Sequence, residues 1–104
     1  MARKQKLYRV NESEHFNLMS MYEHLLVMRD DARECGDIEA EETAEGRIWE
    51  VEKLLDEAWC VGARVDWPTL KRIREIREER QNIRYAIAIA AGVNEQDAAY
   101  AYAV

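Results

Sequence analysis

The sequence has few of the residues that turn, break or cross-link a chain. Its 104 residues include one proline, four glycines and two cysteines. A short chain with so few turn-forming residues is expected to form few, long elements, and this favours helices. Two cysteines are too few for a disulfide framework. If Cys60 lies about 22 residues along the helix that begins after Cys35, the two lie roughly 33 Å apart, beyond disulfide reach, so we expect both to be reduced and buried.

Long apolar runs are also missing. No stretch approaches the apolar length of a transmembrane helix, and the basic start MARKQKLYRV lacks the apolar segment of a secretory signal. These absences predict a cytoplasmic protein that does not bind membranes. The net charge of −6 disfavours a general nucleic-acid binder, because attraction to phosphates supplies most non-specific affinity.

Apolar spacing and capping residues predict the elements. We expect a flexible basic arm over residues 1–10 and a single helical domain over residues 11–104. Capping residues, the proline and three glycines divide this domain into long helices near 13–35, 37–61 and 66–91 and a short helix that begins at 94. The predicted fold class is all-α, a small bundle of three long helices plus a short C-terminal helix. The second and third helices are expected to be antiparallel neighbours, because the link between them is short.

The first predicted helix is apolar around more than one face. Between Phe16 and Met28 only Asn17, Ser20, Glu23 and His24 are polar, whereas a surface helix of a single chain needs only one apolar stripe. A chain this short cannot cover both faces, so we predict a homodimer. The predicted interface comprises Phe16, Met19, Leu26 and, from the second helix, Trp49. The alternative for Trp49 is that it covers the end of its own bundle.

Charges are segregated between the second and third predicted helices. Residues 37–57 contain nine acidic and two basic side chains, and residues 71–84 contain six basic and three acidic ones. Ion pairs between the helices explain this pattern. Arg80 lies within the isoleucine stripe of the third helix and is the expected member of a buried or interfacial pair. The residues of that stripe are Ile73, Ile76, Ile83 and Ile87. The alternative is that the acidic face binds a basic partner or imitates a nucleic-acid backbone. The residues of that predicted face are Glu41, Glu42, Glu45 and Glu52.

Patterns for catalysis and metal binding are incomplete. Neither cysteine belongs to a recognisable nucleophile motif, and no glycine-rich phosphate loop is present. Glu12 and His15 have the Glu-x-x-His spacing of di-iron helix bundles, but the second copy and the further facing glutamates are missing. We therefore expect no catalytic residue, no metal site and no cofactor.

The segment EETAE at residues 41–45 places three glutamates on one side of a helix. It is similar to the first magnesium motif of the MazG-type nucleotide pyrophosphohydrolases, and this resemblance implies magnesium-dependent cleavage of nucleotides. That family adds a Glu-x-x-Asp motif on a later helix. Here Glu52 and Asp56 are one residue too far apart and lie on the same predicted helix, so an enzyme ranks third among the interpretations.

Residues 72–102 combine the pattern RIRE, a glycine turn at Gly92 and Asn94 as the capping residue of a following helix. These features resemble the helix-turn-helix of lambda-repressor-like regulators. The resemblance implies DNA binding by three side chains: Asn94, Gln96 and Tyr100. Where such a helix reads DNA, this one also presents Glu95 and Asp97, whose carboxylates repel phosphates.

These observations together favour a small interaction protein without enzymatic activity. We interpret the chain as a helical protein that binds and modulates another macromolecule through its acidic face, as a phage- or mobile-element-type inhibitor would. The expected partners are a second copy of the chain and another protein. The alternative is a DNA-binding transcriptional regulator that uses the C-terminal helix-turn-helix, with nucleic acid as its partner.

Overall fold

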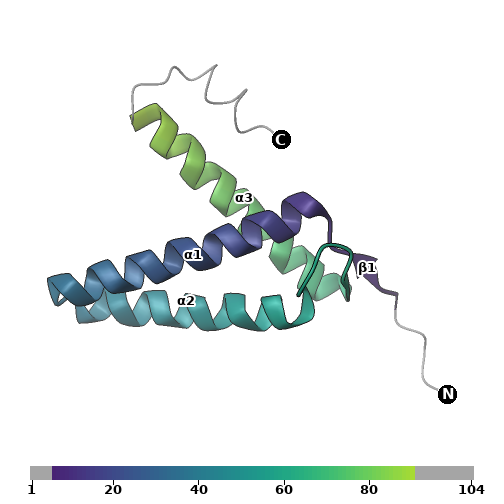
Figure 1. The fold of residues 1–104 in the computed structure, drawn as a ribbon, viewed down its shortest axis with the longest axis horizontal. Coiled ribbons are helices and arrows are strands. Elements are labelled where there is room, and N and C mark those ends of the chain that lie inside the picture. The colour runs from purple at the N-terminus through teal and green to yellow at the C-terminus, as the bar shows by residue number, and fades with distance from the viewer. Residues whose placement is uncertain (1–5, 91–104) are drawn as a thin grey trace.

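The computed structural model describes residues 6–90, which form three long helices and a short two-stranded ribbon (Figure 1). The elements in chain order are β1 Tyr8–Arg9, α1 Glu12–Cys35, α2 Ile38–Glu57, β2 Arg64–Val65 and α3 Trp67–Ala90. The all-α prediction is confirmed, and the three long predicted helices are present. The predicted short C-terminal helix lies outside the described residues. Within residues 6–90, no helix combines the length and the apolar character that crossing a membrane requires.

Capping residues set the α1–α2 hairpin. The Asn11 side chain accepts a hydrogen bond from the Glu14 N–H, and the Glu14 carboxylate accepts one from the Asn11 N–H. At the other end of α1, Gly36 adopts the left-handed conformation with φ 71°. The Asp37 side chain then accepts a backbone hydrogen bond from the first turn of α2. Because one helix ends and the next begins within two residues, α1 and α2 run antiparallel (Figure 1).

The hydrophobic core lies between the hairpin and the first half of α3. Its buried side chains come from the three helices, from the ribbon and from residues beside them: Val10, Leu18, Met21, Leu25, Ile48, Val51, Ala58, Val65, Leu70, Ile73 and Ile76. The apolar stripes that helical spacing predicts for the three helices extend beyond the residues of the core. Met28, Trp59 and Ile87 continue them in the sequence but are exposed, because no other described helix covers these positions.

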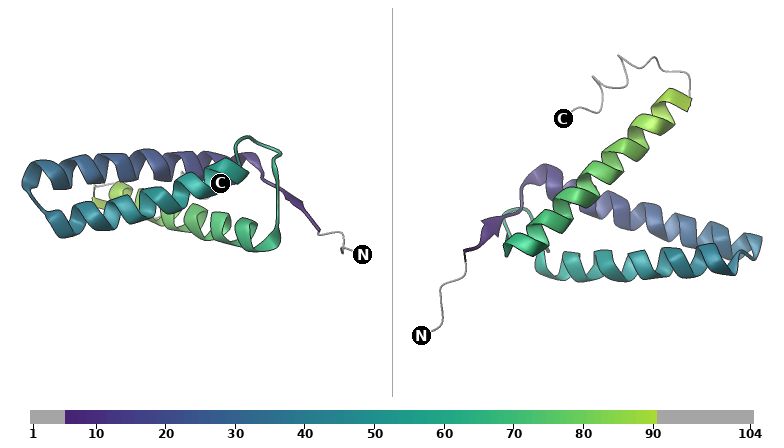
Figure 2. Two further views of the ribbon diagram at one scale, coloured as in Figure 1. Left: turned by 90° about the horizontal axis from the view of Figure 1, so that it is seen from below. Right: turned by 180° about the vertical axis from the view of Figure 1, so that it is seen from behind.

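The third helix does not lie along α2 as expected. α3 crosses α1, and its second half extends away from the hairpin (Figures 1 and 2). It meets α2 through side-chain ion pairs, between Arg47 and Glu79 and between Glu50 and Arg72. The predicted cross-helix ion pairs therefore exist, but the prediction of antiparallel neighbours is wrong. The radius of gyration is 16.1 Å, larger than the ~13 Å of a compact domain of about 100 residues.

Residues 8–10, which the sequence assigned to a flexible arm, belong to the folded unit. Tyr8 and Arg9 pair antiparallel with β2, and the buried Val10 donates its N–H to a carbonyl just before β2. A two-residue strand is too short to show the alternation by which strands are predicted, so the sequence pattern misses it. Residues 1–5 of the predicted arm lie outside the described part of the chain.

Both cysteines are free thiols, as expected from their separation, but neither is buried. Cys35 is exposed in the last turn of α1, and Cys60 is half-buried in the loop between α2 and β2. Both positions lie near the ends of the hairpin helices. Cys35 lies at the end of the hairpin that is far from α3, which crosses α1 nearer its N-terminal end (Figure 1).

Two glycine-to-alanine substitutions are expected to change stability in opposite directions. Gly36→Ala should destabilise the fold by about 1 kcal/mol, because φ 71° is strained for a residue with a Cβ even though nothing lies within 4 Å of that atom. Gly46→Ala, in the interior of α2 and equally open, should stabilise it by about 0.5–1 kcal/mol. Urea unfolding of both variants measures these changes in the free energy of unfolding. Effects of the same sign would contradict the left-handed assignment at Gly36.

Candidate partner-binding surface

The inner face of α3 changes its chemistry halfway along the helix. Leu70, Ile73 and Ile76 are buried against the rest of the core. The residues that follow on this face, at helical spacing, are the partly buried Ile83 and three half-buried arginines: Arg77, Arg80 and Arg84. Charged guanidinium groups are rarely buried as fully as an isoleucine side chain. The packing of α3 therefore becomes less close after Ile76, and the helix extends away from the hairpin (Figure 2).

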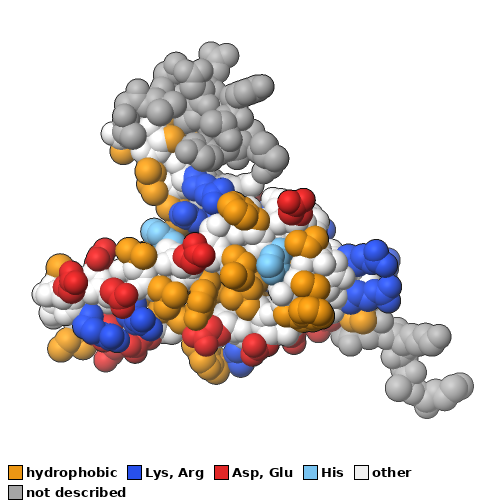
Figure 3. Space-filling view, viewed as in Figure 1, with side chains coloured by type: hydrophobic (Ala, Val, Ile, Leu, Met, Phe, Trp, Pro, Cys, Tyr) orange, Lys and Arg blue, Asp and Glu red, His pale blue; other side chains and the backbone are white. Residues whose placement is uncertain are grey.

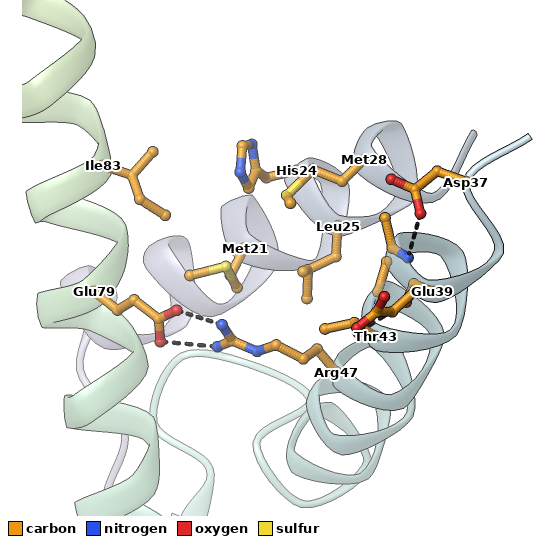
Figure 4. Close-up of a pocket in the computed structure, with 12 residues that line it drawn as sticks. Met21, His24, Leu25, Met28, Asp37, Glu39, Thr43, Arg47, Glu79 and Ile83 are labelled. Atoms are coloured by element: carbon orange, nitrogen blue, oxygen red, sulfur yellow. Dashed lines mark hydrogen bonds and ion pairs between the residues drawn. The ribbon is translucent and has the colours of Figure 1, made fainter. Parts of the chain in front are cut away.

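This arrangement leaves a cavity of about 520 Å³ between the three helices (Figure 4). Its apolar residues are Met21, Leu25 and Met28 from α1, Ala40 and Ala44 from α2, and Ile83 from α3. Polar side chains complete the lining: His24, Asp37, Glu39, Thr43, Arg47 and Glu79. The volume falls within the range of about 300–1,000 Å³ that is usual for binding pockets. We call this space the methionine cavity.

Ion pairs between α2 and α3 fix the width of the methionine cavity. Both Nη atoms of Arg47 donate to the two carboxylate oxygens of Glu79 across the cavity (Figure 4). Arg72 makes the same kind of paired contact with Glu50, at 2.6 and 3.1 Å. The hydrogen bond from Arg47 lowers the pKa of Glu79, and the one from Arg72 lowers the pKa of Glu50. Because these groups are partly exposed, each pair stabilises the fold only modestly.

A third ion pair fastens α3 to the start of α1. The fully buried Glu14 accepts hydrogen bonds from the Asn11 N–H and, at 2.8 Å, from Nε of Arg74. The same carboxylate therefore caps α1 and holds α3. Arg72 and Arg74 belong to the RIRE pattern that resembles a helix-turn-helix, and both are engaged in ion pairs within the chain.

The structure divides the four glutamates of the predicted acidic face into two groups. Glu41 and Glu45 form ion pairs with Arg33 of α1 at 3.0 and 3.4 Å. Glu42 and Glu52 are exposed and have no ion pair among residues 6–90. The hairpin thus neutralises half of this surface and leaves the other half available to a partner.

The predicted dimer residues also differ in their surroundings. Phe16, Met19 and Trp49 are 54%, 39% and 63% exposed. Leu26 is half-buried and packs against the core, because its side of α1 turns toward α2. The Lys53 ammonium lies 4.0 Å from the centre of the Trp49 ring. Figure 3 shows hydrophobic side chains gathered in separate patches over α1 and α2, with acidic groups between them.

Arg80 does not form the predicted buried ion pair within residues 6–90, and a pair across an interface stays a prediction. It is half-buried, as expected, but no carboxylate in the described part of the chain forms an ion pair with it, and its Nε and Nη1 atoms are buried without a hydrogen-bond partner. Sequence reasoning also missed His24, Met28 and Ile83, which line the methionine cavity. The run of arginines along the isoleucine stripe was the available signal that the packing becomes less close there.

Other predicted sites lie beyond what the structure describes. Asn94, Gln96 and Tyr100 fall outside the described residues, so DNA binding by this segment stays a prediction. In the described ranges, no group of three or more His, Cys, Asp or Glu side chains is arranged to hold a metal ion. Comparison with known proteins gives no relative: no family model, no curated protein and no solved structure matches the chain.

The ion pairs between α2 and α3 predict a loss of stability in acid. The pKa values of Glu50 and Glu79 are lowered in the folded state. Their stabilisation is therefore fully present above the ordinary glutamate pKa of about 4.3 and is lost as the pH falls through the lower folded-state values. Glu79→Gln should reduce stability near neutral pH and should flatten its fall between about pH 5 and pH 3. Urea unfolding across this range measures both effects. The matched control Glu42→Gln, which removes an unpaired carboxylate, should change neither, and an equal effect would contradict the assignment.

Proposed function

We propose that the protein is a small non-enzymatic interaction protein that binds and modulates another protein by receiving one of its helices in the methionine cavity. The observation that carries this proposal is the cavity between the three helices, to which each helix contributes apolar side chains and which is open to the surface. An amphipathic helix that inserts its apolar face between other helices is a recurrent mode of recognition.

The lining of the cavity suits a side chain that enters from outside. Met21 and Met28 contribute unbranched side chains that adapt to different shapes, and such residues are frequent at surfaces that accept peptide helices. Met28 is half exposed, so a bound apolar group would remove it from water. Burial of this kind favours binding by about 25 cal/mol for each Å² of apolar surface.

Charge indicates the chemistry of the partner. Asp37 and Glu39 line the cavity at the start of α2, and the exposed Glu42 and Glu52 lie further along the same helix. Arg47, the one cation in the lining from α2, is already paired with Glu79. The negative surface would therefore attract a basic segment and orient it. We infer that the bound helix has one apolar face and several lysine or arginine residues.

A substitution in the cavity tests this function. Met28→Glu should weaken partner binding at least about tenfold, because it places a charge where an apolar contact is needed. Met28 is 48% exposed, so the fold should be retained. A photo-crosslinking amino acid in place of Thr43, which lines the cavity, would capture the partner in a host lysate and identify the bound peptide.

The control is Val61→Glu, in a loop that does not line the cavity, at a residue 54% exposed. Wild type and Val61→Glu should capture the same peptide with a basic amphipathic sequence, and Met28→Glu should lose it. Capture of the same peptide by all three proteins, or capture of a peptide without an apolar helical face, would contradict the proposal.

We also propose that two copies associate through the outer side of the hairpin. The molecule measures 56 × 37 × 17 Å along its principal axes. The smallest of these dimensions, 17 Å, is less than the width of two helices, each about 10–12 Å across. No further layer of described helices therefore covers the outer side of the hairpin. Phe16, Met19 and Trp49 remain exposed there, and exposed apolar groups of this size are typical of interfaces. A second copy would cover the same face in both subunits.

Met19→Glu is expected to separate the two copies. It introduces a carboxylate into the proposed interface at a residue already 39% exposed, so the fold of the subunit should persist. Light scattering should report a dimer for the wild type and for the control Val61→Glu, and a monomer for Met19→Glu. A wild-type protein that remains monomeric at about 100 μM would rule out a dimer of useful affinity.

A further inference from the structure

Positive charge is concentrated at the end of the molecule that carries the ribbon. Residues 1–11 contain four basic side chains and residues 58–65 contain one, and neither segment contains an acidic one, although the net charge of the chain is −6. The pairing of β1 with β2 brings the described parts of these segments together. Figure 3 shows Lys and Arg side chains gathered at this end. We call it the basic end, formed by Lys6, Leu7, Tyr8, Arg9, Trp59, Arg64 and Trp67.

Two arginines of the basic end lie side by side without a counter-ion. Arg9 and Arg64 are directly opposite each other in the ribbon, and both are exposed. Side chains in such positions leave the same face with their Cβ atoms about 4.5–5.5 Å apart, and like charges there destabilise the pairing. Neither guanidinium forms an ion pair within residues 6–90. A surface with negative charge would relieve this repulsion.

The carboxylates that border the two segments have other partners. Glu57 and Asp66 accept hydrogen bonds from the hydroxyl and the N–H of Thr69, at the start of α3. Glu12 lies in the first turn of α1, where the positive end of the helix attracts a carboxylate. The acidic residues in the first half of α2 lie toward the far end of the hairpin (Figure 1). Charges are screened beyond about 8 Å at physiological ionic strength, so these distant carboxylates oppose little.

Exposed apolar groups accompany the positive charge. Leu7 and Trp67 are half exposed, and Trp59, in the loop before β2, is 74% exposed. The Tyr8 ring lies 5.7 Å from the Trp67 ring between centroids, and the Lys6 ammonium lies 5.4 Å from the centre of the Tyr8 ring. Tryptophan and tyrosine are enriched where a protein meets the headgroups of a bilayer, because their rings are apolar and carry one polar group.

We propose that the basic end binds the surface of a membrane that contains anionic lipids, independently of the protein partner proposed above. Arg9 and Arg64 bind the lipid phosphates and carboxylates, and Leu7 and Trp59 enter the boundary between headgroups and acyl chains. A nucleic acid also offers phosphates, but it fits less well. Residues 6–10 and 58–65 contain no Ser, Thr, Asn or Gln side chain for contacts with a base.

This proposal revises the expectation of no membrane binding. That expectation followed from the lack of a long apolar run, but such a run is needed to cross a bilayer and not to bind its surface. The charges and apolar groups of the basic end come from two segments far apart in the sequence, and the ribbon joins them.

Flotation of the full chain with vesicles tests the proposal. The probes are vesicles of phosphatidylcholine alone, vesicles with about 30 mol% phosphatidylserine, and a single-stranded oligonucleotide of about 20 nucleotides. The protein should float with the phosphatidylserine vesicles only, and added salt should weaken this binding. Equal flotation with both vesicles, or no flotation with either, would overturn the proposal. So would displacement from the vesicles by the oligonucleotide at an equal concentration of phosphate, which would assign the basic end to nucleic acids.

The double substitution Arg9→Gln with Arg64→Gln tests the charges. It should weaken binding to the phosphatidylserine vesicles at least about tenfold. The melting temperature without vesicles should not fall, because opposed like charges are removed. The control, Arg29→Gln with Arg33→Gln, removes the same charge near the far end of the hairpin and should weaken binding less than about twofold. Equal losses would mean general charge attraction, and a large fall in melting temperature would mean a structural role; either result overturns the proposal.

Trp59→Ala tests the apolar contact. It should weaken binding to the same vesicles at least about tenfold, because a large ring no longer enters the boundary region. The control is Ile38→Ala, at a residue 70% exposed at the start of α2 and distant from the ribbon. This control should bind as the wild type does. Wild-type binding by Trp59→Ala, or equal losses in the two variants, would contradict insertion at the basic end.

Discussion

The arrangement of this protein depends on one constraint, the point along α3 where its inner face changes from aliphatic to guanidinium side chains. Up to Ile76 the helix is buried against the rest of the core, and beyond it three half-buried arginines lie beside the partly buried Ile83, so the packing is less close. The helix crosses the hairpin rather than running along it. The methionine cavity follows from this crossing.

Charge segregation shapes the surface around the methionine cavity. Some acidic groups of α2 pair with arginines of α1 and α3, and these pairs hold the helices at a fixed separation. The remaining charges are left on different sides, with carboxylates along α2 beside the methionine cavity and the guanidinium groups of Arg80 and Arg84 where α3 crosses α1. A basic helix at the methionine cavity would meet charge of the opposite sign.

Stability is distributed unevenly along the chain. In the hairpin, capping residues end α1 and begin α2. The first half of α3 is held by the ion pair with the buried Glu14, and β2, just before α3, pairs with β1. The last described turns of α3 expose Ile87 and Ile89 and contribute little to the core. Segments with few buried contacts open more easily than the core, and binding surfaces are commonly built from them. The mobile part of the binding surface would then be α3 and the fixed part the hairpin.

Much of the fold was determined by the sequence itself. The helix boundaries near Asn11, Gly36 and Asp37 follow from capping chemistry, and the stripes that form the core follow from helical spacing, because both depend on residues within a few positions of each other. The direction of α3, the ribbon and the unpaired Arg80 depend on contacts between residues more than fifty positions apart, such as those of residues 8–10 with the loop before α3. Only the tertiary structure decided these features, since periodicity shows which face of a helix is apolar but not which helix, ion pair or cavity that face will meet.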